Sequence, residues 1–224
     1  MNNEARQAIL DSIRSHLAAS VPYDAHELTE PSAVGPGRSQ STVPLVELFT
    51  ENLEAVGGHC IIAQGDTEIA RALTQIIHDL QKTNLRAQQI AISDNPNVER
   101  LMYLTDLEIE ELTIVPNASD IFSYDVGIST AQAAIAETGT LVLDSADERH
   151  RLVSLVPPVH ITIVDASRIC ETLGEALARL RNGKELSRTV TLVTGPSRTA
   201  DIELTLTVGV HGPQELYVIV STLT

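Results

Sequence analysis

Residues 60–92 have the sequence CIIAQGDTEIARALTQIIHDLQKTNLRAQQIAI. The stretch begins with the short apolar run Cys60-Ile-Ile-Ala63 and ends with a second one, Ile90-Ala-Ile92. Between them, segment 67–82 places apolar residues on one helical face, namely Ile69, Leu73, Ile76, Ile77 and Leu80. This order of strand, amphipathic helix and strand is typical of parallel strands that are joined by a helical crossover.

The same alternation continues along the chain. Further short runs, most of them rich in β-branched residues, occur at 112–115, 140–143, 161–164, 190–193 and 216–220. Such runs are typical of strands that are covered on both faces of a parallel sheet. A second helix is predicted over 167–182, where Ile169, Leu173, Ala176, Leu177 and Leu180 share one face. The sequence therefore predicts an α/β fold, a three-layer α/β/α sandwich with a mostly parallel sheet.

The chain before this pattern has a different character. Ile9, Ile13 and Leu17 recur every four residues and predict an N-terminal amphipathic helix. Residues 20–44 hold several prolines and glycines with few large apolar side chains, which is typical of a linker or a loosely packed arm. From Leu45 a helix is predicted that Gly57-Gly58 ends. We therefore expect a helix and arm over 1–44 and a single α/β domain over 45–224.

The composition excludes several classes of protein. The 224 residues carry a formal net charge of −15, and 43% of them are hydrophobic while only 3% are aromatic. An apolar content this high excludes global disorder, and no uncharged apolar run approaches the ~20 residues that a membrane span needs. Charges interrupt the first twenty residues, so no signal peptide is predicted and a cytoplasmic location is expected. Nucleic-acid binding is not expected, because basic residues and stacking aromatics are scarce.

The cysteine content limits the cofactors that this chain could hold. Cys60 and Cys170 are the only two cysteines, and neither has a ligand-spaced histidine nearby. An iron–sulfur cluster that needs four thiolates therefore exceeds what the chain offers. We expect reduced, partly buried thiols, although a disulfide is compatible with the sequence. The chain itself is expected to carry no metal centre.

The charges are unevenly distributed. Nearly half of the negative excess lies in residues 97–125, whereas eight of the 15 basic residues follow residue 125, namely Arg149, Arg151, Arg168, Arg179, Arg181, Lys184, Arg188 and Arg198. An anion site is therefore predicted in the C-terminal half. No Walker A loop, nucleophile elbow, dinucleotide fingerprint or HExxH helix occurs in the chain.

The loop Ala136-Glu-Thr-Gly-Thr140 leads into one of the predicted strands. It offers the carboxylate of Glu137, the hydroxyls of Thr138 and Thr140, and a backbone at Gly139 that a ligand can approach closely. In a functional interpretation, Glu137 is a general base or an acyl-accepting nucleophile and the threonines donate hydrogen bonds. The alternative is a turn with a solvated or capping glutamate.

A second loop, Thr194-Gly-Pro-Ser-Arg-Thr-Ala-Asp-Ile-Glu203, directly follows the predicted strand 190–193. Its strand ends at Gly195, and Ser197 or Thr199 is predicted to cap a new helix with Asp201 near the first turn. Free N–H groups at a helix start, together with Arg198, would hold a carboxylate or a phosphate. In the alternative interpretation, an acidic side chain of the same loop occupies those donors.

Two histidines occupy turns that precede predicted strands. His160 ends the turn Pro157-Pro-Val-His160, and His211 lies in Val210-His-Gly-Pro213. Either could be an acid–base group near neutral pH, or could bond only to the backbone.

Five motifs occur together in one order along the chain. They are Gly127-Ile-Ser-Thr-Ala131, Ile135-Ala-Glu-Thr-Gly-Thr-Leu141, Leu155-Val-Pro-Pro-Val-His-Ile161, the loop 194–203 and Gly209-Val-His-Gly-Pro213. With these motifs the chain resembles the lactate-utilisation protein C family, whose domain is called LUD. The likeness is dense over residues 120–221 and thin before residue 45.

The resemblance implies a fold similar to that of ribose-phosphate isomerases, glucosamine-phosphate deaminases and coenzyme A transferases. It also implies a cytoplasmic role in the oxidation of L-lactate to pyruvate, carried out with two partner proteins that hold iron–sulfur clusters. This chain is similar to the partner without clusters, in agreement with its two cysteines. Glu137 is also similar to a loop glutamate that coenzyme A transferases of this general fold use as a nucleophile.

The sequence does not determine whether the chain forms homo-oligomers. It leads to three functional hypotheses. In the first, the chain is a subunit that binds lactate, pyruvate or another small anion near Ser197 and Arg198 and presents it to redox partners. In the second, it is a stand-alone isomerase or acyl-CoA transferase-like enzyme on an anionic substrate, with Glu137 catalytic. In the third, it is a regulatory or scaffold domain with an empty site.

Overall fold

The structure is a computed structural model that describes residues 3–19, 44–108, 111–145, 148–149, 151–180, 189–200, 206–208 and 212–222. The chain divides into two units, residues 1–40 and 41–224. The first unit contains α1 (Asn3–Ala19), the N-terminal helix that the apolar spacing predicts. Its side chains Ile9 and Ile13 are exposed.

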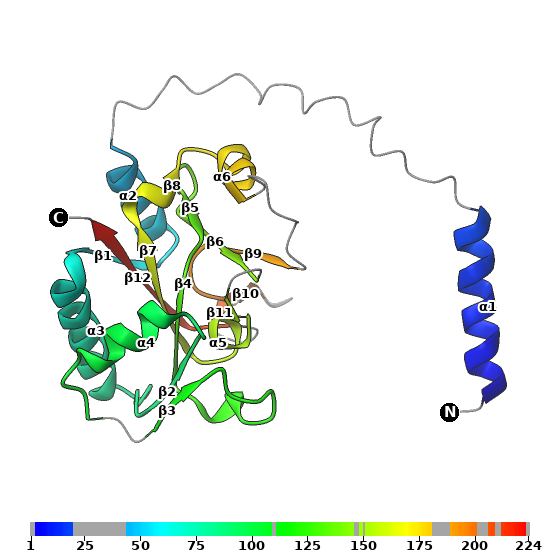
Figure 1. Cartoon of the computed structure of the whole chain (residues 1–224), viewed down its shortest axis with the longest axis horizontal. Coiled ribbons are helices and arrows are strands. Elements are labelled where there is room, and N and C mark those ends of the chain that lie inside the picture. The colour runs from blue at the N-terminus through cyan, green and yellow to red at the C-terminus, as the bar shows by residue number, and fades with distance from the viewer. Residues whose placement is uncertain are drawn as a thin grey trace. The chain divides into compact units, whose positions relative to one another are not determined.

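A sheet of six strands, all parallel, forms the centre of the second unit (Figure 1). In spatial order the strands are β1 (His59–Gln64), β12 (Glu215–Thr222), β7 (Val159–Asp165), β4 (Val126–Thr130), β2 (Gln89–Ile92) and β3 (Glu111–Ile114). The inner strands β7 and β4 are buried along almost their whole length, as apolar strands with both faces covered should be.

One face of this sheet is covered by α3 (Gly65–Gln81) and α4 (Pro96–Tyr103), which Figure 1 shows on the same side. The predicted apolar face of α3 is buried, and it consists of Ile69, Leu73, Ile76, Ile77 and Leu80. These side chains pack in one cluster with strand residues that include Ile90, Ile128 and Ile161. The prediction from residues 60–92 is therefore confirmed.

The opposite face carries α2 (Leu45–Ala55) and a second sheet of four strands. Those strands are, in spatial order, β8 (Ile169–Cys170), β5 (Ala133–Ile135), β6 (Thr140–Asp144) and β9 (Val190–Val193). Phe49 and Leu53 of α2 are fully buried in a cluster that also contains Val218 of β12 and Leu141 of β6. This cluster joins the two sheets.

The remaining elements are short. They are η2 (Ile121–Ser123), α5 (Arg151–Leu155), η3 (Ala166–Arg168), α6 (Leu173–Leu180), β10 (Arg198–Ala200) and β11 (Leu206–Val208). With helices flanking a parallel central sheet, the predicted three-layer α/β/α fold is confirmed.

Three local predictions are wrong. The runs 140–143 and 190–193 form antiparallel pairs in the second sheet, because the chain reverses at Gly139 with φ +63° and β6 folds back on β5. The predicted helix 167–182 begins later: Asp165 caps η3, Ile169 is buried in strand β8, and within the described residues 167–180 the α-helix covers 173–180. The predicted helix after Ser197 is a strand, since β10 pairs antiparallel with β11.

The connections of the central sheet reverse direction between two neighbouring strands. The strand β2 leads outward to β3, whereas its other neighbour β4 leads to β7 on the opposite side. Loops that leave the carboxyl ends of β2 and β4 therefore diverge and leave room between them, which is where open α/β sheets bind ligands. Among the helices that the structure describes, none is long and apolar enough to cross a membrane.

Candidate functional site

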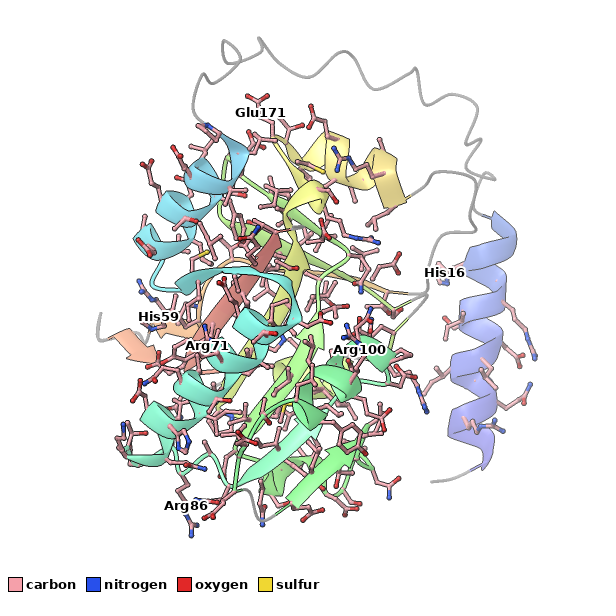
Figure 2. The ribbon with its side chains drawn as sticks, turned by 60° about the vertical axis from the view of Figure 1, so that its left-hand side comes forward. His16, His59, Arg71, Arg86, Arg100 and Glu171 are labelled. Atoms are coloured by element: carbon pink, nitrogen blue, oxygen red, sulfur yellow. The ribbon has the colours of Figure 1, made fainter. Side chains whose placement is uncertain are left out.

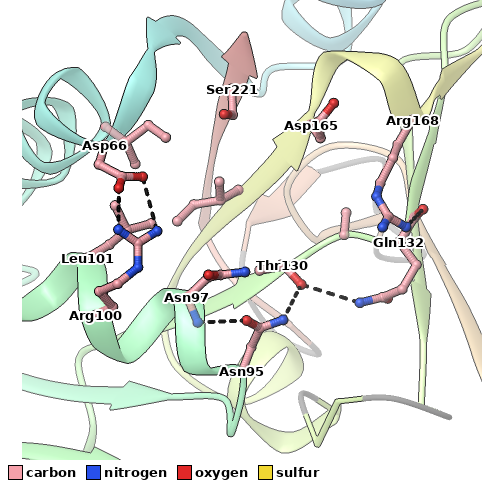
Figure 3. Close-up of a pocket in the computed structure, with 13 residues that line it drawn as sticks. Asp66, Asn95, Asn97, Arg100, Leu101, Thr130, Gln132, Asp165, Arg168 and Ser221 are labelled. Carbon is pink, nitrogen blue, oxygen red and sulfur yellow. Dashed lines mark hydrogen bonds and ion pairs between the residues drawn. The ribbon is translucent and has the colours of Figure 1, made fainter. Parts of the chain in front are cut away.

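A pocket of about 440 Å³ opens at the carboxyl ends of the central strands. Five parallel strands lead into the segments that line it, so their ends meet at one edge of the sheet. The lining residues are Asp66, Ile69, Asn95, Asn97, Arg100, Leu101, Thr130, Ala131, Gln132, Ile163, Asp165, Arg168 and Ser221. Most of these are polar or charged, and Figure 3 shows them around the opening.

The wall beside β2 and β4 is a network of neutral polar groups. Asn95 Nδ2 donates to Thr130 Oγ1 at 3.2 Å, and Gln132 Nε2 approaches the same oxygen at 3.4 Å (Figure 3). The other end of the Gln132 amide, Oε1, accepts a hydrogen bond from Asp144 N at 2.6 Å. The network therefore ties the loop after β2 to the loop after β4 and holds both amide planes in place.

Glu148 lies behind this wall and joins its members. Its carboxylate accepts hydrogen bonds from Thr130 N at 2.9 Å, from Gln132 Nε2 at 3.0 Å, from Asn95 Nδ2 at 3.4 Å and from the Thr130 hydroxyl. The next residue, Arg149, donates from its backbone N and its Nε to Asp94 at 2.6 and 2.7 Å. Burial alone would raise the pKa of Asp94, but these two hydrogen bonds from Arg149 lower it. The adjacent residues Glu148 and Arg149 thus attach their segment to the loop after β2.

The start of α4 forms a second side of the pocket. Asn95 caps the helix, because its Oδ1 accepts from Asn97 N at 3.0 Å, and Pro96 occupies the first helical position. One turn further on, Arg100 forms a two-pronged ion pair with Asp66, whose Oδ1 lies 3.1 Å from Nη2 (Figure 3). The hydrogen bond from Arg100 lowers the pKa of Asp66. The charge of Arg100 is therefore already neutralised by Asp66.

Arg168 is a cation of a different kind on the far side of the pocket. Its Nη1 donates to the backbone oxygen of Gln132 at 3.3 Å, which holds the exposed guanidinium beside Gln132 (Figure 3). Asp165 also lines the pocket, but its Oδ1 accepts from Ser167 N at 2.8 Å and Ser167 Oγ at 2.5 Å. Within the residues described, no carboxylate lies within ion-pair distance of Arg168.

This arrangement is suited to holding a small anion. A planar guanidinium can donate two parallel hydrogen bonds to a carboxylate, and Asn97 and Ser221 supply further polar groups at the same opening. Over the described part of the chain, no group of three or more His, Cys, Asp or Glu residues could hold a metal ion.

The predicted loop around Glu137 lies elsewhere, in the turn between β5 and β6. Glu137 N donates to Glu171 O at 3.1 Å, and Figure 2 shows Glu171 well apart from Arg100 of the pocket. Thr140 Oγ1 lies 2.7 Å from Thr138 Oγ1 and 2.7 Å from Thr194 Oγ1. The structure thus brings the two predicted loops together through a chain of three hydroxyls.

This turn packs against α2. A Cβ added at Gly139 would lie 2.3 Å from Leu53 N, and one added at Gly195 would lie 2.8 Å from Val56 O. Arg198 passes close to Gly57, and Ser197 N donates to Pro213 O at 2.8 Å. None of these residues lines the carboxyl-end pocket.

Of the two predicted histidines the structure describes His160, which does not line the pocket. His160 is fully buried as the second residue of β7, with Nε2 2.9 Å from Ser129 Oγ and 2.8 Å from Thr162 Oγ1. His160 thus lies in the strand and not in the turn before it, because the turn ends at Pro158 and the strand begins at Val159. His211 and Asp201 lie outside the described residues, as does the side chain of Thr199.

A sequence model of the LUD domain matches residues 46–221, more than three quarters of the chain. The chain belongs to the LUD domain family. The predicted LUD domain is thereby confirmed, and it contains every residue that lines the pocket.

Curated relatives of this LUD domain include proteins named lactate utilization protein C, which confirms the predicted resemblance to that family. Lactate utilization protein C of Geobacillus thermodenitrificans is 29% identical over 183 residues, which are 80% of this chain and 69% of that protein. Its counterpart in Bacillus subtilis is 41% identical over 102 residues, 43% of this chain and 42% of that protein. An uncharacterized protein of Neisseria meningitidis serogroup B is 34% identical over 152 residues, 66% of this chain and 61% of that protein. The match thus spans from about two fifths to about two thirds of these relatives' own length.

A solved structure is similar to the LUD domain in fold. The crystal structure of a DUF162 family protein from Deinococcus radiodurans superposes with a TM-score of 0.54 at 23% identity, covering 79% of this chain and 96% of that one. Identity at this level supports the shared architecture alone.

Sequence reasoning missed the residues of the pocket, although a weak signal for them exists. Polar residues lie at the carboxyl ends of β1, β2, β4 and β7 or within three positions after them, for example Asp66, Asn95, Gln132 and Asp165. The Asn95-Pro96 pair is also a helix-start signal. A search for polar residues after the predicted parallel strands would have found Asp66, Asn95 and Asp165 but not Gln132, because no strand is predicted over 126–130.

Proposed function

We propose that this chain acts in the utilisation of L-lactate, as a subunit that binds a small organic anion and works with iron–sulfur partner proteins. The family match and the relatives named lactate utilization protein C support the process. The oxidation of L-lactate to pyruvate releases two electrons and two protons, so it requires an electron acceptor. In this proposal the clusters of the partner proteins take the electrons, since the chain has only two cysteines.

The observation that carries the anion-binding part is the state of Arg168. Its guanidinium is exposed at the carboxyl-end pocket, and its hydrogen-bond partner there is a backbone oxygen rather than a carboxylate. A cation in this setting gains more from a ligand anion than Arg100, which Asp66 already neutralises. We therefore propose Arg168, and not the predicted Arg198, as the anchor of the anion.

A growth experiment tests this function. In the organism that encodes the chain, deletion of its gene should abolish growth on L-lactate as the sole carbon source and leave growth on pyruvate unchanged. The wild-type gene should restore growth on L-lactate, and so should Arg198→Ala. Arg168→Ala should fail to restore it while the variant protein accumulates to the wild-type level.

A second measurement separates a subunit from a stand-alone enzyme. The purified chain alone should not oxidise L-lactate with any soluble electron acceptor, because the partners hold the clusters. Steady turnover by the purified chain, without added iron or flavin, would contradict the subunit proposal.

A further inference from the structure

Glu148 is a buried acidic side chain directly behind the pocket wall. It is 2% exposed, and its four hydrogen-bond partners are the Thr130 N–H, the Thr130 hydroxyl and the side-chain amides of Asn95 and Gln132. All four donate, so Glu148 acts only as an acceptor, as an ionised carboxylate does. The wall therefore has a negative charge behind it.

The charge of Glu148 is not neutralised by the groups that bind it. None of its four donors carries a formal charge, and the adjacent Arg149 is paired with Asp94 at 2.7 Å. A charge that is held away from water is poorly screened and acts on neighbouring groups over a longer distance than a surface charge. Glu148 therefore contributes a negative potential to the pocket.

The other formal charges at the pocket compensate one another only in part. Arg100 and Asp66 form a closed ion pair, while Asp165 is engaged with Ser167 and keeps its negative charge at the opening. That leaves Arg168 as the cation to which a ligand can bind. Gln132 links the negative Glu148 to the positive Arg168, because its side chain donates to Glu148 and its backbone oxygen accepts from Arg168.

We infer that the pocket selects a monoanionic carboxylate over a phosphate dianion, and that Glu148 is the residue that determines this specificity. The inference rests on the proposed function only for the place where the ligand binds. One negative charge on a ligand is matched by Arg168, whereas a second meets no further unpaired cation among the described residues that line the pocket and is repelled by Glu148 and Asp165.

The hydrogen bonds of the wall act in the same direction. A phosphate has more oxygens to satisfy than a carboxylate, and it needs correspondingly more donors. The amide nitrogens of Asn95 and Gln132 each donate to both Glu148 and Thr130 Oγ1, and the Thr130 hydroxyl donates to Glu148, so these donors are not available to additional ligand oxygens. Glu148 thus limits both the charge and the number of oxygens that the pocket accepts.

Calorimetric titration of the full chain with L-lactate, pyruvate and inorganic phosphate at pH 8 tests the inference. The wild-type chain should bind both carboxylates at least about tenfold more tightly than phosphate. Glu148→Gln keeps the shape of the side chain and removes its charge. It should raise the affinity for phosphate about tenfold more than that for L-lactate, because a dianion is repelled twice as strongly as a monoanion.

Two further variants keep the experiment decisive. Glu51→Gln changes the net charge by the same amount on α2, which does not line the pocket, and should leave the affinity ratio at its wild-type value. Asp165→Asn keeps a side chain that can cap η3 and should shift the ratio in the same direction as Glu148→Gln by a smaller factor. If Glu148→Gln does not fold, Asp165→Asn carries the test.

Three outcomes would overturn the inference. These are equal wild-type affinities for phosphate and L-lactate, an affinity ratio in Glu148→Gln that matches Glu51→Gln, and the failure of every probe to bind. Selectivity for carboxylates in a chain that is dispensable for growth on L-lactate would count against the proposed function and leave this inference standing. If the chain does not select carboxylates over phosphate but is still required for growth on L-lactate, this inference fails and the proposed function stands.

Discussion

The carboxyl-end pocket and the turn around Glu137 are both rich in polar side chains, yet they use them differently. In the turn, the hydroxyls of Thr138, Thr140 and Thr194 bond to one another, and Gly139 packs against the backbone of α2. In the pocket, Arg168 is exposed, and its hydrogen-bond acceptor among the described residues is a backbone oxygen. Polar groups that satisfy one another stabilise a fold, whereas an unneutralised charge at a cavity is available to a ligand.

The largest effect expected from this contrast is on the stability of the turn. Gly139→Ala should lower the free energy of unfolding by about 3 kcal/mol or more, because φ is +63° and the new Cβ would lie 2.3 Å from Leu53 N. Gly65→Ala is the matched control, with φ +69° but nothing within 4 Å, and should cost only about 1 kcal/mol of backbone strain. Urea unfolding measures both. Equal losses in the two variants would show that Gly139 is not tightly packed.

The next largest effect is on ligand binding by the pocket. Arg168→Ala should weaken L-lactate binding about 100-fold, since a charge-assisted pair of hydrogen bonds is lost. Arg198→Ala removes the same charge beside the turn and should change the affinity by less than about twofold. Calorimetry measures both constants. The opposite result, with Arg198 required and Arg168 dispensable, would move the site to the loop 194–203.

A smaller effect is expected within the hydroxyl chain of the turn. Thr140 is 5% exposed and its hydroxyl lies 2.7 Å from each of two neighbours, so Thr140→Val should cost about 1–2 kcal/mol of unfolding free energy. Thr191→Val in the same sheet should cost less than about 0.5 kcal/mol, because its hydroxyl makes no hydrogen bond to the described residues. Ligand affinity should stay unchanged in both variants. A weakened affinity in Thr140→Val would mean that the turn communicates with the pocket.

The smallest effect concerns the half-exposed pair Asp66–Arg100. The hydrogen bond from Arg100 lowers the pKa of Asp66 in the folded chain, so the pair stabilises the fold above the unfolded pKa of about 4. That contribution is lost as the pH falls through the lower folded pKa. In melting curves, the stability difference between the wild-type chain and Asp66→Asn should therefore be largest at neutral pH and shrink as the pH falls below about 4. A difference that stays the same from pH 7 through the acid range would show that the pair acts through packing rather than charge.

The elements with strong local patterns could be predicted from the sequence. The apolar face of α3, the end of α2 before Gly57 and the parallel strands on either side of α3 follow from side-chain periodicity and from one glycine pair. Ile169 shows where this reasoning stops. Its spacing to Leu173 fits a helix, but Asp165 caps a shorter turn and Ile169 is buried in β8 instead. Local propensity was overridden there by the pairing of β8 with β5.

The candidate site could be predicted only in outline. Sequence reasoning located function at the carboxyl ends of strands and in an arginine of the C-terminal half, and Arg168 meets both descriptions. It selected Arg198 instead, because the surrounding loop 194–203 has a recognisable composition. Glu148 had no motif around it. Its importance comes from four donors that lie 16 to 53 positions away along the chain.

The sequence by itself determined the fold class and the family, because hydrophobic periodicity and ordered motifs are local properties that survive without knowledge of the contacts. Only the tertiary structure decided which polar groups form hydrogen bonds with one another and which stay accessible to a ligand. Because β2, β4 and β7 are parallel, the segments that follow them bring Asn95, Thr130, Gln132 and Arg168 to one edge of the sheet. An arginine at this edge forms an ion pair only if a carboxylate from another segment lies within reach. That distance depends on how segments far apart in the sequence pack together, so the sequence pattern does not reveal it.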